Sequence, residues 1–573
     1  MSRRVMAGDA DASLLASREG LSFWGGVDAA TGEVIDSHHP LKGQTLGGKI
    51  LAMPTSRGSC TGSGILLELI MNGNAPAALV FSEPESILTL GVLVAQHLFE
   101  QSIPVIQLDP EPFARLCRCE RARIDSERLV ADELDVALVP LSSEALTLTS
   151  HDRALLAGHE GEAAQRAMRI LHDMAVIEGA SHLIDVSRVH IDGCIYASPA
   201  LLSFAEIFAD LGARVKVPTT MNSISVDHSH WRGQGVPEAF GFPASRLADT
   251  YIEMGARPSF TCAPYLLQNA PAANEVIAWS ESNAVIYANS VLGARTAKHP
   301  DLLDLCIALT GRAPCHGVYL DEERRARRII DVDIPPRHDD ALWSLLGYRV
   351  GQLAPDCVPL VTGIDALAPS DDDLKALCAA FGTTSAAPML HIEGITPEAS
   401  CIDPSADRAA ITGVDLADVW QQFNAGAIDI DLVAFGSPHF SLAECRKLAE
   451  LMAGRCCHPA VTGIVTLGRD TLKAAREEGS AQSLEAAGLR LHPDLCWCSI
   501  SEPVFPPAAR TLMTNSGKYA HYAPGLSGRA VRFGSLSECV TALVTGRTTG
   551  TLPDWLRQPP GRPPESDDST TQG

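Results

Sequence analysis

Two of the sixteen cysteines, Cys262 and Cys496, stand apart from the others because they lie on irregular backbone. Cys262 is followed shortly by Pro264, which stops any helix and leaves the thiol on a loop. Cys496 follows Pro493 and leads into Cys498, again beside a break. Well-separated thiols on such backbone suit an iron–sulfur cluster whose ligands come from different segments. The alternative is that each is a small buried hydrophobic residue, as most free cysteines are, and no CxxC pair favours the cluster.

A second candidate for chemistry is the glycine- and serine-rich segment 55–64, which joins a predicted strand to a predicted helix. A turn of this kind exposes backbone N–H groups at the positive end of the helix dipole, which makes an anion-binding site. It is not a P-loop, because the Gly-Lys-Ser/Thr ending is absent. An ordinary turn with a serine cap remains the alternative.

Length and composition restrict the class of protein. A chain of 573 residues predicts several domains, and 46% apolar with 20% charged residues is typical of a globular enzyme. The net charge of −24 argues against a nucleic-acid partner. No stretch approaches the roughly 20 apolar residues of a membrane span, and the early acidic N-terminus is unlike a signal peptide. Sixteen cysteines without an export signal predict reduced thiols or metal ligands in a cytoplasmic protein.

The pattern of apolar residues predicts a small domain at 1–145, a larger domain at 146–550 and a disordered tail at 551–573, where Pro, Gly, Ser and Asp accumulate. In the larger domain, apolar runs at 181–186 and 431–435 are typical of buried parallel strands, whose ends collect function in such folds. The small domain is predicted to be a β/α layer with strands at 49–53, 77–81 and 104–108 and helices at 63–70 and 88–100.

Polar residues that can hold a small acid recur at the predicted strand ends of the larger domain. Each one alone is more often a cap or a turn than a ligand site, but their recurrence favours a shared site. The segments are 190–193, 218–223, 280–283, 289–290, 295–296 and 514–518.

Taken together, these segments give a chain that resembles aconitase X, a divergent branch of the aconitase superfamily. The resemblance implies an α/β, aconitase-like fold, with a small swivelling β/α domain fused N-terminally to a larger three-layered α/β catalytic domain that holds an Fe–S cluster. The matching stretches follow one another over nearly the whole length: SRGSCTGSG, LAGHEGEAAQRAM, HIDG, PTTMNS, YIEMGARPSFTCAPY, SESNAVIYANSVLGARTAKHPDL, IEGITPEA and TNSGKYAHYAPG.

The family has a two-chain form that dehydrates mevalonate 5-phosphate and a fused form that dehydrates cis-3-hydroxy-L-proline, and this fused chain resembles the second. The resemblance implies Cys262, Cys496 and Cys498 as cluster ligands, while Cys60 and Ser437 stay open as alternatives for the third. Ser437 stands where the two-chain enzymes tend to place a cluster cysteine. The loss of that thiol favours a 2Fe–2S cluster over 3Fe–4S or 4Fe–4S.

Aconitases use a serine of the swivelling domain as the base, so the resemblance implies that Ser59 removes the Cα proton, with Ser63 as the alternative base or as a helix cap. A serine anion needs stabilisation, which Arg57 and neighbouring backbone N–H groups are expected to supply. His190 or His521 is expected to protonate the leaving hydroxide.

Lys518 and Arg295 are expected to anchor the substrate carboxylate. The other polar strand-end residues are expected to contact the substrate as well. The expected substrate-binding set is Arg57, Asn222, Ser223, Asn283 and Arg295.

Dehydration of cis-3-hydroxy-L-proline would give an enamine that tautomerises to Δ1-pyrroline-2-carboxylate. In the cis isomer the hydroxyl and the carboxylate lie on one ring face, within reach of one Lewis-acidic iron, and the Cα hydrogen points to the other face. The expected partner is this small molecule alone, and the sequence leaves the oligomeric state open.

Three alternative functions remain. The first is the dehydration of mevalonate 5-phosphate or another β-hydroxy acid. The second is an iron-sensing or RNA-binding role, which the net charge disfavours. The third is a zinc hydrolase, for which HExxH and paired CxxC motifs are absent.

Overall fold

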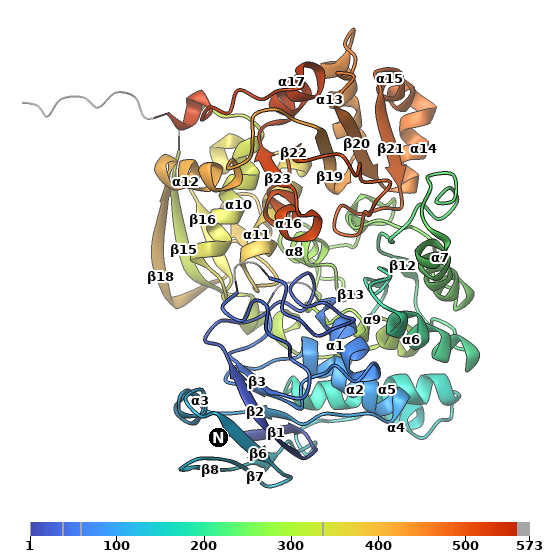
Figure 1. The fold of residues 1–573 in the computed structure, drawn as a ribbon, viewed down its shortest axis with the longest axis vertical. Helices are drawn as coiled ribbons and strands as arrows, with labels where there is room; N and C mark the ends of the chain where they lie inside the picture. The colour runs from blue at the N-terminus through green and yellow to red at the C-terminus, as the bar shows by residue number, and fades with distance from the viewer. Residues whose placement is uncertain (1, 37–38, 58–59, 335–336, 558–573) are drawn as a thin grey trace, which may run out of the picture.

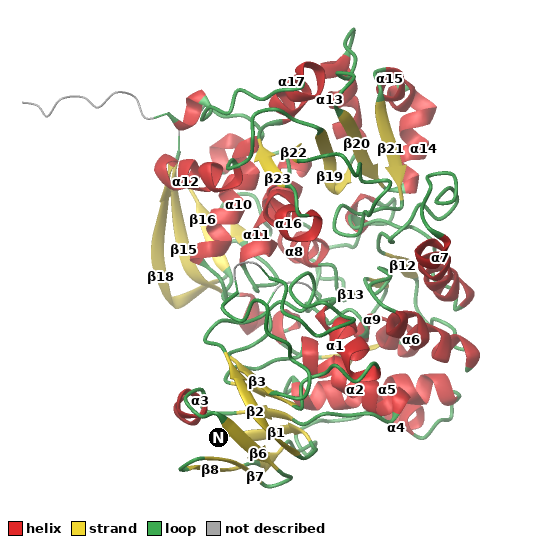
Figure 2. Ribbon diagram, in the orientation of Figure 1, coloured by secondary structure: helices red, strands yellow, loops and turns green. Residues whose placement is uncertain are grey.

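The computed structural model of the chain describes residues 2–36, 39–57, 60–334 and 337–557. The molecule is an α/β protein in which helices cover the β-sheets (Figure 2). The N-terminal sheet lies at one end of the molecule and the sheet of the C-terminal segment at the other (Figure 1). Among the described helices, none combines the length and the apolar character that a membrane crossing requires.

The first 140 residues form a nine-stranded mixed sheet of order β8-β7-β6-β2-β3-β4-β5-β1-β9. Strands β2 to β5 are parallel, and alternate residues of β3 belong to two different hydrophobic clusters, so this strand is buried on both faces. The predicted strands and helices of this domain are confirmed. The elements are β1 (Arg3–Met6), β2 (Ala10–Ala16), β3 (Ile50–Met53), α1 (Gly62–Met71), β4 (Ala78–Phe81), α2 (Ile87–Phe99), β5 (Val105–Gln107), α3 (Pro110–Leu116), β6 (Arg121–Ile124), β7 (Arg128–Ala131), β8 (Leu134–Ala137) and β9 (Val139–Pro140).

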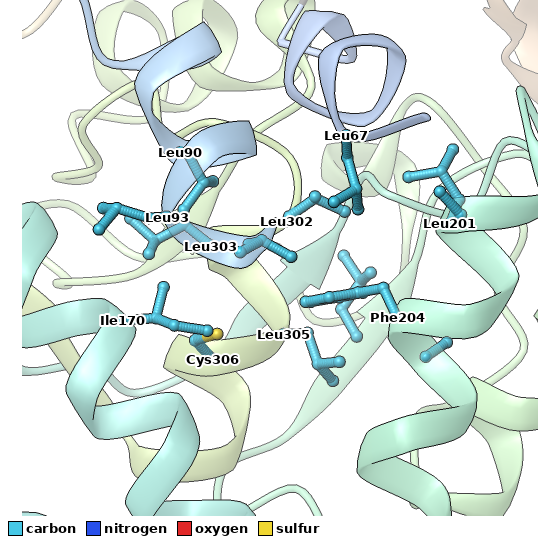
Figure 3. Close-up of a cluster of buried hydrophobic side chains, with 14 of the residues drawn as sticks. Leu67, Leu90, Leu93, Ile170, Leu201, Phe204, Leu302, Leu303, Leu305 and Cys306 are labelled. Carbon is cyan, nitrogen blue, oxygen red and sulfur yellow. The ribbon is translucent and has the colours of Figure 1, made fainter. Parts of the chain in front are cut away.

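Helices α1 and α2 dock this N-terminal domain, called the lid below, onto the rest of the chain. Their side chains share one hydrophobic core with α5 (Glu162–Ile177), α6 (Pro199–Asp210) and α9 (Leu303–Thr310). Gly64 permits the close approach of α1 to α6, because a Cβ atom at this position would lie 2.5 Å from Leu201 Cδ2. Figure 3 shows the apolar contact, with Leu67, Leu90 and Leu93 of the lid facing Ile170, Leu201, Phe204, Leu302, Leu303, Leu305 and Cys306.

The segment after the lid contains a parallel three-stranded sheet of order β12-β11-β13. The run at 181–186 was expected to be a buried parallel strand, but β10 pairs antiparallel with β14 in a separate two-stranded ribbon. An apolar run indicates a buried strand but not the direction of its partner, which here comes from a distant part of the chain. The remaining elements are α4 (Ser150–Leu156), β10 (Leu183–Asp185), β11 (Val189–Ile191), β12 (Thr219–Met221), α7 (Glu238–Glu253), η1 (Pro264–Leu266), β13 (Ala278–Trp279), α8 (Ser282–Ser290), β14 (Arg312–Pro314), η2 (Gly317–Tyr319) and η3 (Asp321–Arg324).

A four-stranded parallel sheet of order β17-β16-β15-β18 comes next, and α10 and α12 pack beside its edge strand. Helix α11 packs mainly on α10 and also contacts α8 and α16 (Gly517–Ser527), so it connects this layer with the neighbouring segments. The elements are β15 (Ala326–Asp333), α10 (Ala341–Leu353), β16 (Pro359–Thr362), η4 (Asp365–Leu367), α11 (Asp371–Thr384), β17 (His391–Ile392), β18 (Ile402–Thr412) and α12 (Gly413–Phe423).

The last sheet is parallel, with five strands in the order β21-β20-β19-β22-β23. Alternate residues of β19 belong to two different hydrophobic clusters, so helices cover both faces and this part is three-layered, as expected. The apolar run at 431–435 is confirmed as a buried parallel strand. The elements are β19 (Leu432–Phe440), α13 (Leu442–Met452), β20 (Thr462–Leu467), α14 (Arg469–Glu478), α15 (Ser480–Ala486), β21 (Leu489–Pro493), β22 (Thr511–Thr514), α16 (Gly517–Ser527), β23 (Ala530–Phe533), α17 (Leu536–Thr545) and η5 (Asp554–Leu556).

The predicted disordered tail begins too early at 551. The chain continues in a 3-10 turn, η5, where Leu556 is buried against the core that contains α12. An apolar residue in this polar segment is enough to hold the turn on the protein. Residues 558–573 lie outside the described part of the chain.

Candidate active site

Polar residues at the carboxyl ends of two parallel sheets face one another. In each sheet, successive strands are added first on one side of a central strand and then on the other. The central strands are β11 and β19. Ligands of parallel α/β sheets bind at such topological switch points. The resulting set combines residues of the two sheets: Asp192 after β11, Asn222 and Ser223 after β12, Glu281 after β13, Cys496 and Cys498 after β21, and Lys518 after β22.

The three predicted cysteine ligands lie together. The neighbouring thiols of Cys262 and Cys498, with Lys518 and His439 nearby, hold the pKa of Cys496 well below its usual range. The Cys498 backbone N–H also donates to Cys496 Sγ at 3.4 Å. Cys496 is therefore the preferred thiolate of the three. Cys60 is not one of these three thiols. Its thiol donates to the Ser280 carbonyl oxygen at 3.6 Å, next to Glu281, and burial raises its pKa to about 12.

The two loops that carry these cysteines are linked by side chains. Phe260 and Asp494, each two residues before a cysteine, have φ angles of 41° and 72°, in the left-handed region that non-glycine residues rarely adopt. The Arg469 guanidinium binds both carboxylate oxygens of Asp494, at 2.5 and 2.8 Å, and its central carbon lies 4.3 Å from the Phe260 ring centroid. One arginine thus braces both strained positions.

His439 forms a second link between the cysteine loops. Its ring is hydrogen bonded to Thr261 Oγ1 at 3.2 Å and to the Leu495 carbonyl oxygen at 2.7 Å, and its backbone N–H donates to Cys262 Sγ at 3.3 Å. A bulge in β19 brings it there, because the pairing with β20 shifts between Phe435 and Phe440. Gly436 permits the bulge: its φ is +94°, and a Cβ atom would lie 2.0 Å from the Thr466 carbonyl oxygen.

The donor set suits an iron–sulfur cluster better than a single metal ion. In the ranges that the structure describes, no three His, Cys, Asp or Glu side chains are arranged as ligands of one metal ion. Three converging thiols, one already favoured as a thiolate, are the ligands that iron–sulfur clusters use. Ser437, on the same β19 bulge as His439, has a buried hydroxyl with no hydrogen-bond partner in the part of the chain that the structure describes. The residues present fit a cluster by their chemistry.

A buried ion pair lies beside the thiols. Lys518 Nζ donates to Glu281 Oε1 at 2.7 Å, and both side chains are mostly shielded from solvent. Burial works against the charged lysine, but Glu281 and the three thiols raise its pKa well above the usual value. Burial likewise opposes ionisation of Glu281, yet Lys518 keeps its pKa below the usual value. The lysine is therefore a fixed cation next to the cysteines.

The predicted asparagines surround this ion pair. Asn283 donates to Glu281 Oε1 at 2.6 Å and to the Cys262 carbonyl oxygen at 3.2 Å. Asn222 donates to Glu281 Oε2 at 3.2 Å and to the carboxylate of Asp192. Ser223 is buried and hydrogen bonds to the Asn222 side-chain oxygen, so it orients that amide.

A cavity of about 50 Å³ lies among these groups. This volume is far below the roughly 300–1,000 Å³ of typical small-molecule pockets. Another cavity, of about 200 Å³, lies at the seam of the lid and the body, and no thiol lines it. The small cavity is lined by Trp24 and Thr61 of the lid and by Asp192, Ile195, Glu281, Ser282, Asn283, Ala379, Gly382, Thr383, Cys496, Cys498, Lys518 and Tyr522.

Of the two serines that were predicted as the base, the structure describes Ser63 but not Ser59. Ser59 lies outside the described residues, two positions before Thr61, which lines the cavity. Ser63 is fully buried and donates to the Asp301 carboxylate and to the Cys60 carbonyl oxygen. Thr61, not Ser63, is the N-cap residue of α1, so the expectation that Ser63 caps this helix is wrong. Arg57 is exposed, and it does not line the cavity.

Three predicted residues lie apart from the cavity. Arg295 is held by Asp321 at 2.6 Å and by Glu398 at 3.7 Å, because carboxylates near η3 and β17 already engage its guanidinium. His190 is buried inside β11, where burial lowers its pKa to about 4 and leaves it a neutral ring. His521 is exposed and hydrogen bonded to Tyr348. The structure gives none of the three its expected contact with the substrate space.

Several residues of the site had no role assigned from the sequence. Asp192 and Glu281 lie within the polar segments 190–193 and 280–283, so the strand-end pattern was their signal. His439 and Arg469 gave no such signal, because their roles depend on two loops that meet only in the folded chain. The sequence likewise gave no indication that Tyr522 and Trp24 line the cavity.

The chain is similar to known proteins over nearly its whole length. It matches the family models described as Aconitase X swivel domain at residues 1–131, first domain at 145–322, second domain at 326–421 and third domain at 430–545. All four segments contribute residues to the small cavity.

The chain is also similar to individual proteins of known name or structure. The chain is 51% identical to a cis-3-hydroxy-L-proline dehydratase of Pseudomonas aeruginosa, over 97% of this chain and 98% of the relative. It is 47% identical to a protein of the same name from Hypocrea jecorina, over 96% of each. The crystal structure of Thermococcus kodakaraensis aconitase X in its holo-form is similar with a TM-score of 0.63 and 32% identity, covering 69% of this chain and all of that one.

Replacing Cys496 by serine is expected to remove cluster iron, because this thiol is the centre of the triad. Cys262→Ser and Cys498→Ser should also lower iron and acid-labile sulfide in anaerobically purified protein. Cys456→Ser is the matched control, since Cys456 is exposed and remote in the chain from both loops. A variant of the triad that keeps full iron and visible absorbance would not have lost a ligand.

Replacing His439 by alanine is expected to loosen both cysteine loops, because two buried hydrogen bonds disappear at a cost of about 1–3 kcal/mol each. The thermal midpoint should fall, and a chelator should remove iron faster than from the unmodified protein. His159→Ala, at an exposed position, should change neither quantity. Unchanged iron release in His439→Ala would show that the loops hold their geometry without this link.

Proposed function

The chain belongs to the aconitase X family, and we propose that it is a hydro-lyase that dehydrates cis-3-hydroxy-L-proline. Its homologues are dehydratases, and two near full-length relatives carry this substrate in their names. The observation that carries the proposal is the cavity, where three thiols and one lysine meet under a lid. The product would be an enamine that becomes Δ1-pyrroline-2-carboxylate.

The cofactor we propose is a 2Fe–2S cluster on Cys262, Cys496 and Cys498. Ser437 supports the small cluster, since a hydroxyl stands where the two-chain enzymes tend to place a thiol, and that hydroxyl is buried without a partner. When bound, such a cluster supplies Lewis acidity toward the hydroxyl and carboxylate oxygens of the substrate.

Lys518 is proposed to hold the substrate carboxylate. Glu281 engages one side of its ammonium group, which leaves further N–H donors for the cavity. Asn283 and Asn222 hold Glu281 from the other side, so the lysine has little freedom to move away. With the carboxylate fixed beside the thiols, the cis hydroxyl lies on the same face and the Cα hydrogen faces the lid.

The base is proposed to be Ser59 of the lid. Thr61, two residues later, is a wall of the cavity, so the segment that carries Ser59 comes to the substrate space from the lid side. Ser63 suits this role less, because its hydroxyl is committed to Asp301, whose pKa burial raises to about 7. We propose that Ser63 holds the closed lid on the body.

The two runner-up functions fit the cavity and the chain less well. Mevalonate 5-phosphate carries a phosphate and a carboxylate but no cation, whereas Lys518 is the one cationic side chain among the described cavity walls. An RNA-binding or iron-sensing role needs basic surface for phosphate contacts, and the net charge is −24.

Ser59→Ala is expected to lower turnover by the ~10²–10⁴ that a general base contributes, with substrate binding largely kept. Ser63→Ala should instead lower the thermal midpoint, because it removes one of the hydrogen bonds that the buried Asp301 carboxyl accepts, at a cost of about 1–3 kcal/mol. Steady-state kinetics and thermal unfolding of both variants measure this. The reverse pattern would make Ser63 the base.

The substrate itself is tested with the isomers of hydroxyproline. Turnover of cis-3-hydroxy-L-proline to a pyrroline carboxylate, trapped with o-aminobenzaldehyde, is expected, while the trans-3 and trans-4 isomers should remain unchanged. The trans-3 isomer places its hydroxyl and carboxylate on opposite faces, so it cannot present both to the thiol side. Equal rates on cis and trans would contradict this geometry, and activity on mevalonate 5-phosphate alone would identify the other branch of the family.

A further inference from the structure

We propose that Asp192 binds the secondary ammonium group of the substrate and so selects amino acids over carbocyclic and phosphorylated β-hydroxy acids. This inference rests on the proposed function and names the group in the cavity that recognises the ring nitrogen.

The charges of the cavity walls carry the argument. Among the described walls, the ionisable side chains other than thiols and a tyrosine are Asp192, Glu281 and Lys518. Lys518 forms its ion pair with Glu281, so Asp192 has no direct ion pair among the described residues, and Lys518 acts on it only from a distance. A buried carboxylate without a cation is costly unless a ligand supplies the missing charge. A ring ammonium supplies it.

Asp192 is built to present its carboxylate at a fixed place. It is only 7% exposed, it follows the buried strand β11, and its backbone N–H donates to Asp304 Oδ2 at 2.5 Å. Asn222 donates to its Oδ1, which aims the carboxyl group. These contacts use the backbone and one carboxylate oxygen, so the second oxygen remains for a donor in the cavity.

The surroundings of Asp192 make a cationic ligand favourable. Burial, together with the neighbouring Glu281 and Asp301, raises the pKa of Asp192 well above its usual value. A positive group bound beside Asp192 would lower this pKa again, because an opposite charge favours the carboxylate form. A phosphate or a second carboxylate would add to the repulsion instead.

Glu281 is a poorer ammonium partner. Its Oε1 already accepts from Lys518 and Asn283, and its Oε2 accepts from Asn222. Asp192 would hold the ring nitrogen and Lys518 the carboxylate, while the C3 hydroxyl faces the thiols. All three ring and carboxylate substituents of Cα are then placed, so the Cα hydrogen points toward the lid.

The test compares two unreactive ligands that differ in the ring nitrogen, L-proline and cyclopentanecarboxylate. Their dissociation constants are measured by calorimetry on the intact protein and on Asp192→Asn. The unmodified protein is expected to bind L-proline at least about tenfold more tightly, and Asp192→Asn should lose most of that preference by weakening L-proline alone. Asp210→Asn, an exposed carboxylate at the end of α6, is the matched control and should keep the preference.

A second variant covers the case in which Asp192→Asn fails to fold. Asn222→Ala removes the hydrogen bond that aims the carboxylate and should reduce the preference for L-proline without abolishing it. Equal affinity of the unmodified protein for the two ligands would overturn the proposal, and so would a folded Asp192→Asn that binds L-proline as before. Turnover of cis-3-hydroxy-L-proline by the unmodified protein reports separately on the proposed function, since an enzyme that dehydrates it while ignoring the nitrogen would refute only the role of Asp192.

Discussion

The buried ion pair between Glu281 and Lys518 is the constraint on which the site depends. It joins the carboxyl ends of two sheets that lie far apart in the sequence, and it sets a fixed positive charge beside three thiols. Removing one partner of such a pair costs about 3–5 kcal/mol, because the other charge is left buried. The asparagines are arranged around it, each donating to one oxygen of Glu281. The pair therefore fixes the position of the cation that we propose for the substrate carboxylate, and it leaves the Asp192 wall of the cavity acidic.

The cysteine loops show how the fold holds thiols in place before any cofactor binds. Both loops contain a non-glycine residue with positive φ, and such a strained backbone conformation persists only where contacts from neighbouring residues hold it. Arg469 and His439 supply these contacts, since each of them contacts both loops. A site prepared in this way spends less of the binding free energy on ordering its ligands, which favours the cluster that we propose.

The sequence predicted the helices and strands better than the side-chain contacts of the site. Apolar runs and glycine-rich turns located the strands and helices of the lid, because these signals are local, and the strand-end pattern found Asn222, Asn283 and Lys518. Arg295 failed for a physical reason: a polar strand-end residue is equally suited to ion pairs with its own domain, and Asp321 and Glu398 take its guanidinium. His190 failed because a polar residue inside a short strand can be buried completely. His439 and Arg469 could not be found, since their function exists only between loops separated by more than two hundred residues.

The division of the site among four segments explains why a lid is needed at all. A wall made only by the body would leave thiols and a buried lysine open to water, where their electrostatic interactions weaken. Trp24 and Thr61 close that side, and the apolar contact in Figure 3 together with the bond from Ser63 to Asp301 holds the lid on the body. The cavity of about 50 Å³ is much smaller than typical small-molecule pockets, so we expect the lid to move when a ligand enters. An apolar contact needs no directional bonds to form again, and the hydrogen bonds that accompany it, such as those from Ser63 to Asp301 and from the Ala200 backbone to Glu68, are few enough for the lid to open.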